Sequence, residues 1–206
     1  ITSDVFLSPL DEHNAADNKS KLEKRRQGRL DKIQGDYYLM TGFASESLTR
    51  FNSAIERAKA NSDSLWLAGA MEGAVAAQVY IHVTAGNAAD DTVLIDKVME
   101  QYDEVFKLYR KKRVAELEAG SALRLAEYLG RWTNRRKEAI ESANQASNVG
   151  RELRSTKRQS LWEALARFFE AMGCRRKAAL YLYRLGQLDA SPDLWSKAVT
   201  LITASA

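Results

Sequence analysis

The sequence predicts an all-α protein, with about nine helices in antiparallel hairpins stacked as an α-solenoid. Three observations predict this fold. No proline lies between Pro9 and Pro192, and proline is the residue that helix interiors exclude most strongly. Apolar side chains recur at spacings of three and four residues, which places them on one helical face. Two segments far apart in the chain also carry the same hairpin motif, and such repetition indicates a repeat architecture.

Composition restricts the class of protein. The chain has 206 residues, of which 45% are hydrophobic, enough to build a core and to exclude a wholly disordered chain. No apolar run approaches the roughly 20 residues of a membrane-spanning helix. Asp4 stands where a signal peptide would be basic, and the start at Ile1 rather than Met suggests a piece of a longer polypeptide. The single cysteine, Cys174, has no disulfide partner and fits a reducing compartment.

The chain is expected to divide into a flank and one domain. Residues 1–18 are polar and aperiodic, so we expect a flexible N-terminal flank. Residues 19–206 are expected to form a single α-solenoid domain. Its first helix begins at Lys19, where helical periodicity takes over, and ends at Gly42, because glycine relieves the strain of a left-handed helix end.

The next helices follow from the same periodicity and from the turn residues between them. A helix over 45–60 is followed by one over 65–83, for which Ser62 or Asp63 is the expected N-cap. A loop is expected over 84–91. Further helices are then expected at 92–109, 113–129, 134–148, 158–172 and 175–186.

The last third of the chain carries the clearest boundaries. Residues 148–156 are polar and contain Gly150, so they are expected to connect two hairpins. The final helix has Ser191 as its N-cap, Pro192 at its first position and Asp193 in its first turn.

Two hairpins match the tetratricopeptide (TPR) template, in which small residues let two helices approach and large residues fill the space beside them. The first match comprises Gly35, Tyr38, Gly42, Phe51 and Ala54. The second comprises Trp162, Leu165, Ala166, Phe169, Gly173 and Ala178. Two such hairpins with helices between them predict a TPR-like solenoid. The alternative is a helical bundle whose glycines coincide with the template by chance.

The sequence contains no catalytic constellation. It has neither a Walker phosphate-binding motif nor a G-x-S-x-G nucleophile motif. Its two histidines, His13 and His82, have no second ligand at metal spacing, so we expect neither a metal nor a cofactor. His82 is expected to be a surface or capping residue, and Cys174 a turn residue without a chemical role. We therefore expect a protein that is not an enzyme.

Positive charge is concentrated in the second half of the chain. Residues 1–103 hold 11 Lys and Arg against 16 Asp and Glu, whereas residues 104–206 hold 20 against 11. The candidate partner-facing residues are Arg110, Lys111, Lys112, Arg113, Arg135, Arg136, Lys137, Arg175, Arg176 and Lys177. An edge lined by them would attract an acidic protein or an anionic membrane. The alternative is that they are solvated charges favoured at helix C-termini by the macrodipole.

Nucleic acid is not an expected partner, because no RNA- or DNA-binding signature accompanies the charge. A TPR groove that grips a peptide carboxylate is weakly indicated. Lys32 and Asp36 stand at the positions of its clamp residues, and an aspartate would repel the carboxylate.

One run is too idiosyncratic to be generic repeat sequence, namely D-S-L-W-L-A-G-A-M-E-G over 63–73, which contains Trp66, Gly69 and Gly73. Together with the basic helix over 24–29 and the turn over 35–42, it resembles the large subunit specific to the TRAPP II complex, the family of yeast Trs-one-twenty and animal NIBP. Further matching positions are Gly173, Arg176, Lys177, Ala178 and Arg184.

The resemblance implies an internal helical fragment of a longer subunit in a tethering complex that activates Rab GTPases by nucleotide exchange. The resemblance also implies that the exchange chemistry of that complex is carried by its small core subunits, and that the large subunits position the GTPase and the membrane. The chain would be a non-catalytic scaffold, cytoplasmic and peripheral at Golgi membranes. Its partners would be other TRAPP subunits and, indirectly, a Rab GTPase. Trp66 is expected to pack in the core. The alternative function is a free-standing TPR-type peptide-binding adaptor.

Overall fold

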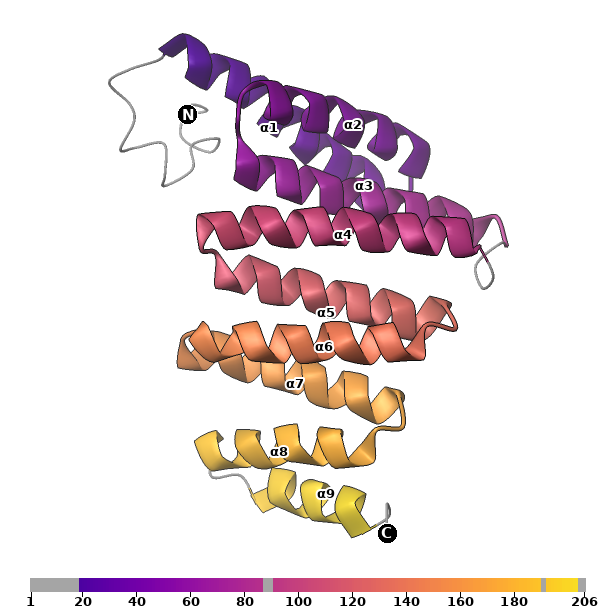
Figure 1. Cartoon of the computed structure of the whole chain (residues 1–206), viewed down its shortest axis with the longest axis vertical. Coiled ribbons are helices and arrows are strands. Elements are labelled where there is room, and N and C mark those ends of the chain that lie inside the picture. The colour runs from indigo at the N-terminus through magenta and orange to yellow at the C-terminus, as the bar shows by residue number, and fades with distance from the viewer. Residues whose placement is uncertain (1–18, 87–90, 190–191, 204–206) are drawn as a thin grey trace. The chain divides into compact units, whose positions relative to one another are not determined.

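The computed structural model describes residues 19–86, 91–189 and 192–203. The expectations for residues 1–18, for the middle of the loop over 84–91 and for Ser191 lie outside these residues. The helices are α1 (Lys19–Met40), α2 (Ala44–Ala60), α3 (Ser64–Thr84), α4 (Thr92–Lys112), α5 (Ala115–Trp132), α6 (Arg136–Val149), the 3-10 helix η2 (Gly150–Glu152), α7 (Ser155–Ala171), α8 (Arg175–Asp189) and α9 (Pro192–Thr203) (Figure 1). The described residues contain no strand. The prediction of an all-α, solenoid-like fold is confirmed.

Glycine sets the geometry of two hairpin turns. Gly42 follows α1 with φ 85°, and Gly173 follows α7 with φ 70°, a region that side chains with a Cβ rarely adopt. Each turn closes with the same kind of backbone hydrogen bond, between residues five positions apart. Phe43 N donates to Tyr38 O at 2.8 Å, as Cys174 N donates to Phe169 O at 2.8 Å. These bonds satisfy carbonyls that the end of a helix would otherwise leave free.

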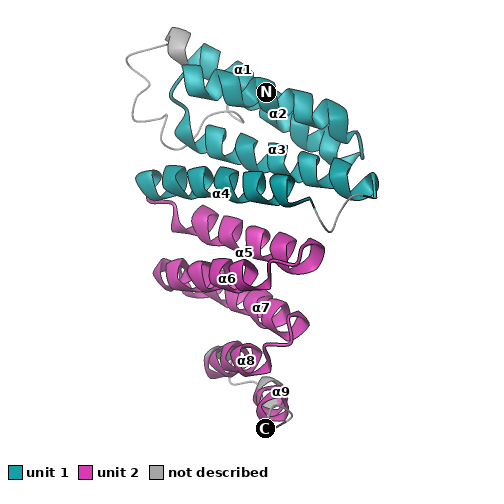
Figure 2. Cartoon of the chain, turned by 45° about the vertical axis from the view of Figure 1, so that its right-hand side comes forward, with its two compact units in different colours: residues 1–112 teal, residues 113–206 magenta. Residues whose placement is uncertain are grey.

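The contacts between helices divide the chain into two compact units, Ile1–Lys112 and Arg113–Ala206 (Figure 2). A single domain over 19–206 therefore stays a prediction.

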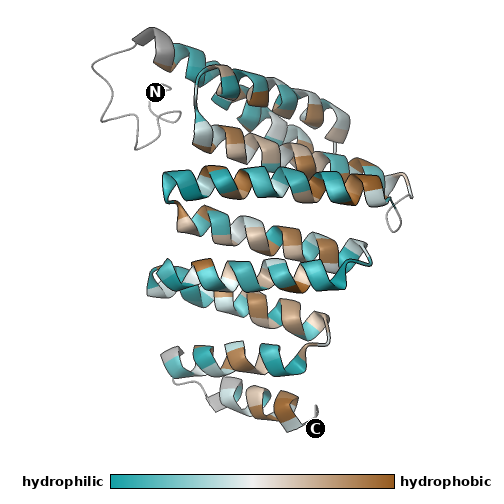
Figure 3. Ribbon diagram, in the orientation of Figure 1, coloured by the Kyte–Doolittle hydropathy of each residue, from teal (hydrophilic) through white to brown (hydrophobic). Residues whose placement is uncertain are grey.

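In the first unit each helix packs against the next, and α1 also contacts α3. Buried residues recur along α4 at helical spacing, as in Val98, Tyr102 and Val105, so one face of this helix is apolar. The alternating hydrophobic and hydrophilic bands of α4 are visible in Figure 3. A hydrogen bond of 2.8 Å from the Tyr109 hydroxyl to Glu72 Oε2 ties α4 to α3. The last helix of the unit is thus fixed by both apolar and polar contacts.

The Phe51 ring of α2 is completely buried and closely packed in the first unit. A Cβ at Gly35 on α1 would lie 2.8 Å from Phe51 Cδ1. A Cβ at Gly73 on α3 would also overlap the ring. The ring therefore lies between two helices that approach it closely only because both positions lack a side chain. The neighbouring α2 residue Ser47 donates from Oγ to the Gly35 carbonyl at 2.9 Å and adds a polar link to α1.

The second unit repeats this construction. Helices α5 and α6 form one hairpin, α7 and α8 form the next, and α9 packs on α8. Ser142 Oγ on α6 donates to the Ala122 carbonyl on α5 at 2.7 Å, the counterpart of the link in the first unit. The rings of Phe169 and Tyr181 stack with their centres 5.6 Å apart. The α5–α6 hairpin thus buries mainly small residues and leucines, whereas the α7–α8 hairpin also buries large rings.

Candidate functional site: a basic surface on the second unit

The first predicted group of basic residues lies at the end of α4. Arg110, Lys111 and Lys112 are exposed in its last turn. Arg113 follows and is exposed too, with φ 56°. Cations are favoured at this end of a helix, because the free carbonyls carry partial negative charge. The macrodipole therefore accounts for these residues, and they do not by themselves indicate a partner.

The other two groups occupy the opposite kind of position. Both have the sequence Arg-Arg-Lys, at 135–137 and 175–177, and they stand at the starts of α6 and α8. Each of these helices is the second of its hairpin. The first turn of α8 contains no acidic residue. Cations at a helix N-terminus are opposed by the macrodipole, so helix electrostatics does not explain either triplet.

The structure brings the two triplets together. The Arg136 guanidinium donates to the Met172 carbonyl and lies 3.8 Å from Cys174 Sγ. Met172 and Cys174 belong to the turn that leads into α8, so the start of α6 is joined to the start of α8. We call Arg135, Arg136, Lys137, Arg175, Arg176 and Lys177 the RRK surface.

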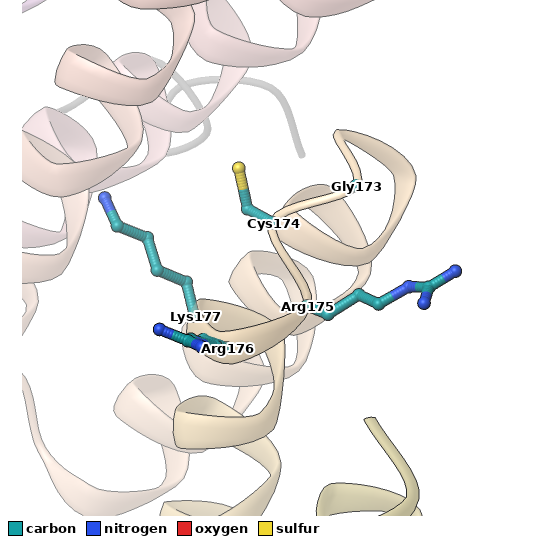
Figure 4. Close-up of a pocket in the computed structure, with 5 residues that line it drawn as sticks. All are labelled: Gly173, Cys174, Arg175, Arg176 and Lys177. Atoms are coloured by element: carbon teal, nitrogen blue, oxygen red, sulfur yellow. The ribbon is translucent and has the colours of Figure 1, made fainter. Parts of the chain in front are cut away.

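The second half of the RRK surface borders an open hollow of about 520 Å³ that is lined by residues 173–177. In Figure 4 the side chains of Arg176 and Lys177 extend to one side of the turn and that of Arg175 extends to the other. Lys177 is held in place, because its Nζ donates to Asn144 Oδ1 at 3.0 Å and lies 5.1 Å from the centre of the Phe169 ring. One of the cations that border the hollow, Lys177, is therefore held in a defined position.

Only part of this charge is compensated. Arg135 Nη1 lies 3.3 Å from Glu138 Oε1, and Lys137 Nζ lies 3.8 Å from Glu141 Oε1. Among the residues that the structure describes, no acidic side chain pairs with Arg136, Arg176 or Lys177. The surface consequently keeps a net positive charge.

The two short runs that carry the family resemblance meet in the first unit. Arg29 is only 2% exposed, and its Nε donates to Asp63 Oδ2 at 2.8 Å. The Arg29 guanidinium carbon lies 5.4 Å from the centre of the half-buried Trp66 ring, within the range of a cation–π contact. The expected role of Asp63 as a side-chain cap of α3 is wrong. Asp63 stands at the N-cap position, but its carboxylate makes no capping bond and binds Arg29 instead.

Further polar contacts join α1 to the elements beside it. Arg25 Nε donates to the Asn61 carbonyl at 3.2 Å. The buried Asp31 carboxylate lies 2.9 Å from Arg57 Nε, and Arg50 Nη1 is 3.8 Å from its other oxygen. Sequence reasoning missed that these residues of a basic helix face inward. The spacing of four residues between Arg25 and Arg29 was the available signal, since it places them on one face.

The remaining motif residues take ordinary structural positions. Ala54, Phe169 and Ala178 are buried, Gly69 and Trp162 are half-buried, and Tyr38 is exposed over about a third of its surface. Tyr38 meets the exposed Phe43 edge-on at 6.5 Å.

Reactive side chains are sparse in the described part of the chain. No group of three or more His, Cys, Asp or Glu side chains there could hold a metal ion. His82 Nδ1 lies 3.9 Å from Asp91 Oδ2, and Cys174 is a half-buried turn residue. None of the described helices is both long and apolar enough to cross a bilayer.

The arrangement at the supposed peptide clamp differs from what a carboxylate requires. Lys32 Nζ binds Asp36 Oδ2 at 2.6 Å, so the lysine is already paired with an acid of its own helix. A peptide carboxylate would have to displace that aspartate and overcome its repulsion.

Comparison with known proteins shows the family to which the chain belongs. Residues 4–86 match the family model described as the Trs120/TRAPPC9 N-terminal domain. The trafficking protein particle complex II-specific subunit 120 homolog of Oryza sativa subsp. japonica is 33% identical over 205 residues, which cover 93% of this chain and 17% of that protein. The chain belongs to the Trs120/TRAPPC9 family. The Arabidopsis thaliana homolog is 31% identical over 92% of this chain and 16% of its own length.

Animal members of the Trs120/TRAPPC9 family match a shorter part. Human trafficking protein particle complex subunit 9 is 38% identical over 64 residues, which cover 31% of this chain and 6% of that protein. The chain spans about a sixth of the length of the two plant relatives named above. The match to the family model contains Arg29, Asp63 and Trp66, so the contact among them lies within the matched residues.

Proposed function

We propose that this chain is a non-catalytic scaffold segment of a TRAPP II subunit, in a complex that tethers vesicles at the Golgi and activates a Rab GTPase by nucleotide exchange. The observation that carries the proposal is the similarity to plant TRAPP II-specific subunits over 92–93% of the chain. Its direct partners would be other TRAPP subunits, and its link to the Rab GTPase would be indirect.

The fold is suited to this role. Helical hairpins that pack on one another offer broad surfaces to partners, because each hairpin contacts mainly its neighbours and leaves its edges exposed. The RRK surface is such an edge, and we propose it as partner-facing. The proposed location is the cytoplasm, at the periphery of Golgi membranes.

Co-purification tests the proposal. The chain, tagged and produced in plant cells, is expected to retain TRAPP subunits on affinity purification, and the purified chain is expected not to stimulate nucleotide release from a Rab GTPase. Retention of no TRAPP subunit would contradict the assignment to the complex. Stimulation of nucleotide release by the chain alone would contradict the non-catalytic role.

A free-standing TPR-type adaptor has less support. The clamp lysine of such an adaptor must be open to a peptide carboxylate, whereas Lys32 is bound to Asp36. Calorimetric titration of the chain with peptides that differ only in a free or amidated C-terminus separates the two functions, because an adaptor with a clamp discriminates between them.

A further inference from the structure

We propose that the RRK surface is a docking site for an acidic segment, rich in Asp and Glu, of a partner protein. The inference rests on the scaffold role proposed above and names the chemistry of one partner.

The position of the cations is the first argument. Arg-Arg-Lys occupies the start of α8, whose first turn holds no acid. The same triplet adjoins the start of α6. Free backbone N–H groups already make a helix N-terminus positive, and acidic residues are favoured there. The first turn of α6 does hold one acid, Glu138, beside Arg136 and Lys137. Both helices thus begin with more basic than acidic residues, which is the less favourable charge. Local rules broken in this way are expected at functional positions.

Preorganisation is the second argument. Arg136 is held by the Met172 carbonyl, and Lys177 by the Asn144 amide oxygen and the Phe169 ring. These partners are neutral, so they fix the side chains without cancelling their charge. Binding of a ligand carboxylate at these side chains therefore costs less conformational entropy than binding at lysines and arginines that must first be ordered. It also gains charge-assisted hydrogen bonds.

Neighbouring charge favours a polypeptide over a lipid bilayer. The second triplet borders an open hollow of about 520 Å³, which is accessible to the side chains of a peptide. Glu138 in the first turn of α6 lies beside Arg135, and Glu141 in the second turn lies beside Lys137. An anionic bilayer would be repelled by both glutamates, whereas an extended peptide can place its acids beside the cations alone.

Charge reversal at the surface supplies the test. The probe is a short fluorescein-labelled peptide of alternating Glu and Ser, and its binding to the 206-residue chain is followed by fluorescence anisotropy. In the double variant Arg136→Glu, Arg176→Glu we expect the dissociation constant to rise about tenfold, because two attractions become repulsions. Binding by the unchanged chain is expected to weaken as salt rises from about 0.01 M to about 0.15 M.

A control variant has the same change in net charge. Arg151→Glu, Arg154→Glu alters two exposed arginines beyond the C-terminal end of α6, whereas the RRK surface is at its N-terminal end. We expect this variant to bind the acidic peptide with less than about a twofold change, since a distant exposed charge is screened. A peptide with Gln in place of Glu is expected not to bind.

Thermal unfolding separates docking from a structural role. Arg176 is exposed in the first turn of α8, where a glutamate is favoured. The single variant Arg176→Glu is therefore expected to weaken peptide binding severalfold without lowering the unfolding temperature. This variant also remains informative if Arg136→Glu disturbs the bond to Met172.

Three results would overturn the inference: equal losses in the two double variants, equal binding of the Gln peptide, or tighter binding to vesicles of phosphatidylcholine and phosphatidylserine than to the acidic peptide. If the chain retains TRAPP subunits but does not bind the acidic peptide, this inference fails and the proposed function stands. If the peptide binds through the RRK surface but no TRAPP subunit is retained, the proposed function fails and the docking chemistry stands.

Discussion

The Phe51 ring and its two glycines allow a sharp test of the packing in the first unit. The perturbation is Gly73→Ala in the middle of α3. A Cβ at this position would overlap the Phe51 ring, which is fully buried and has Gly35 on its other side. The ring cannot move towards α1, because it already lies against Gly35. A Cβ built at Gly35 would be only 2.8 Å from Phe51 Cδ1.

Two opposing effects set the magnitude. Alanine is favoured over glycine in a helix interior by about 1 kcal/mol. Inserting a methyl group into a closely packed core costs about 1–3 kcal/mol. Since Phe51 has no space into which it can move, we take the upper part of that range. Gly73→Ala should therefore lower the free energy of unfolding by about 1–2 kcal/mol, although helix propensity alone predicts the opposite sign.

Urea unfolding followed by circular dichroism measures the effect, and α3 offers a matched control. The nearest side-chain atom to a Cβ at Gly69 is Lys32 Cε at 3.6 Å, an ordinary contact with a flexible side chain. Gly69→Ala should raise the free energy of unfolding by about 0.5–1 kcal/mol. In a double-mutant cycle, Phe51→Leu should recover at least about 0.5 kcal/mol of the loss in Gly73→Ala. The reasoning is refuted if Gly73→Ala stabilises the chain as Gly69→Ala does.

Three further substitutions test other contacts. For each variant the change in the free energy of unfolding is measured by urea denaturation. Asp63→Asn removes the charge opposite a buried guanidinium and should cost about 3 kcal/mol, whereas loss of the exposed Glu23 carboxylate in Glu23→Gln should cost less than about 0.5 kcal/mol; equal costs would contradict a buried pair. Ser142→Ala leaves a carbonyl of α5 without its hydroxyl donor and should cost about 1 kcal/mol; no loss would show that water replaces the bond. Gly42→Ala forces a Cβ into a left-handed turn and should cost about 1–2 kcal/mol, and Gly42→Asn should cost less.

The helical architecture could be predicted from the sequence because its signals are local. The absence of proline, the apolar periodicity and the turn glycines Gly42 and Gly173 determine where helices run and end. Most helix bounds accordingly agree with the expectations to within about three residues. Only one of the two glycines that contact Phe51 could be predicted from the sequence. The TPR template identifies Gly35, but it does not predict that Gly73 also approaches the ring.

The errors and omissions arise from contacts between residues distant in the chain. Asp63 has the sequence context of an N-cap, but its carboxylate binds Arg29 on another helix, 34 positions away. A local rule cannot weigh that competing donor. The join between the basic triplets is similarly distant, since Arg136 reaches the carbonyl of Met172. The unfavourable position of these cations relative to the helix macrodipole could have been predicted from the sequence, because the expected helices over 134–148 and 175–186 already began at the triplets.

The contact among Arg29, Asp63 and Trp66 restricts how segments of this family can be exchanged. Arg29 lies on α1 and its two partners lie at the start of α3, with all of α2 between them. A chimera joined at the turn before α2 would take the guanidinium from one parent and its carboxylate from the other. Where the second parent lacks an acid at that position, the product would bury an unpaired positive charge. Recombination with a relative that lacks this acid should therefore succeed with breakpoints before Arg29 or after Trp66, and fail with breakpoints between Arg29 and Asp63.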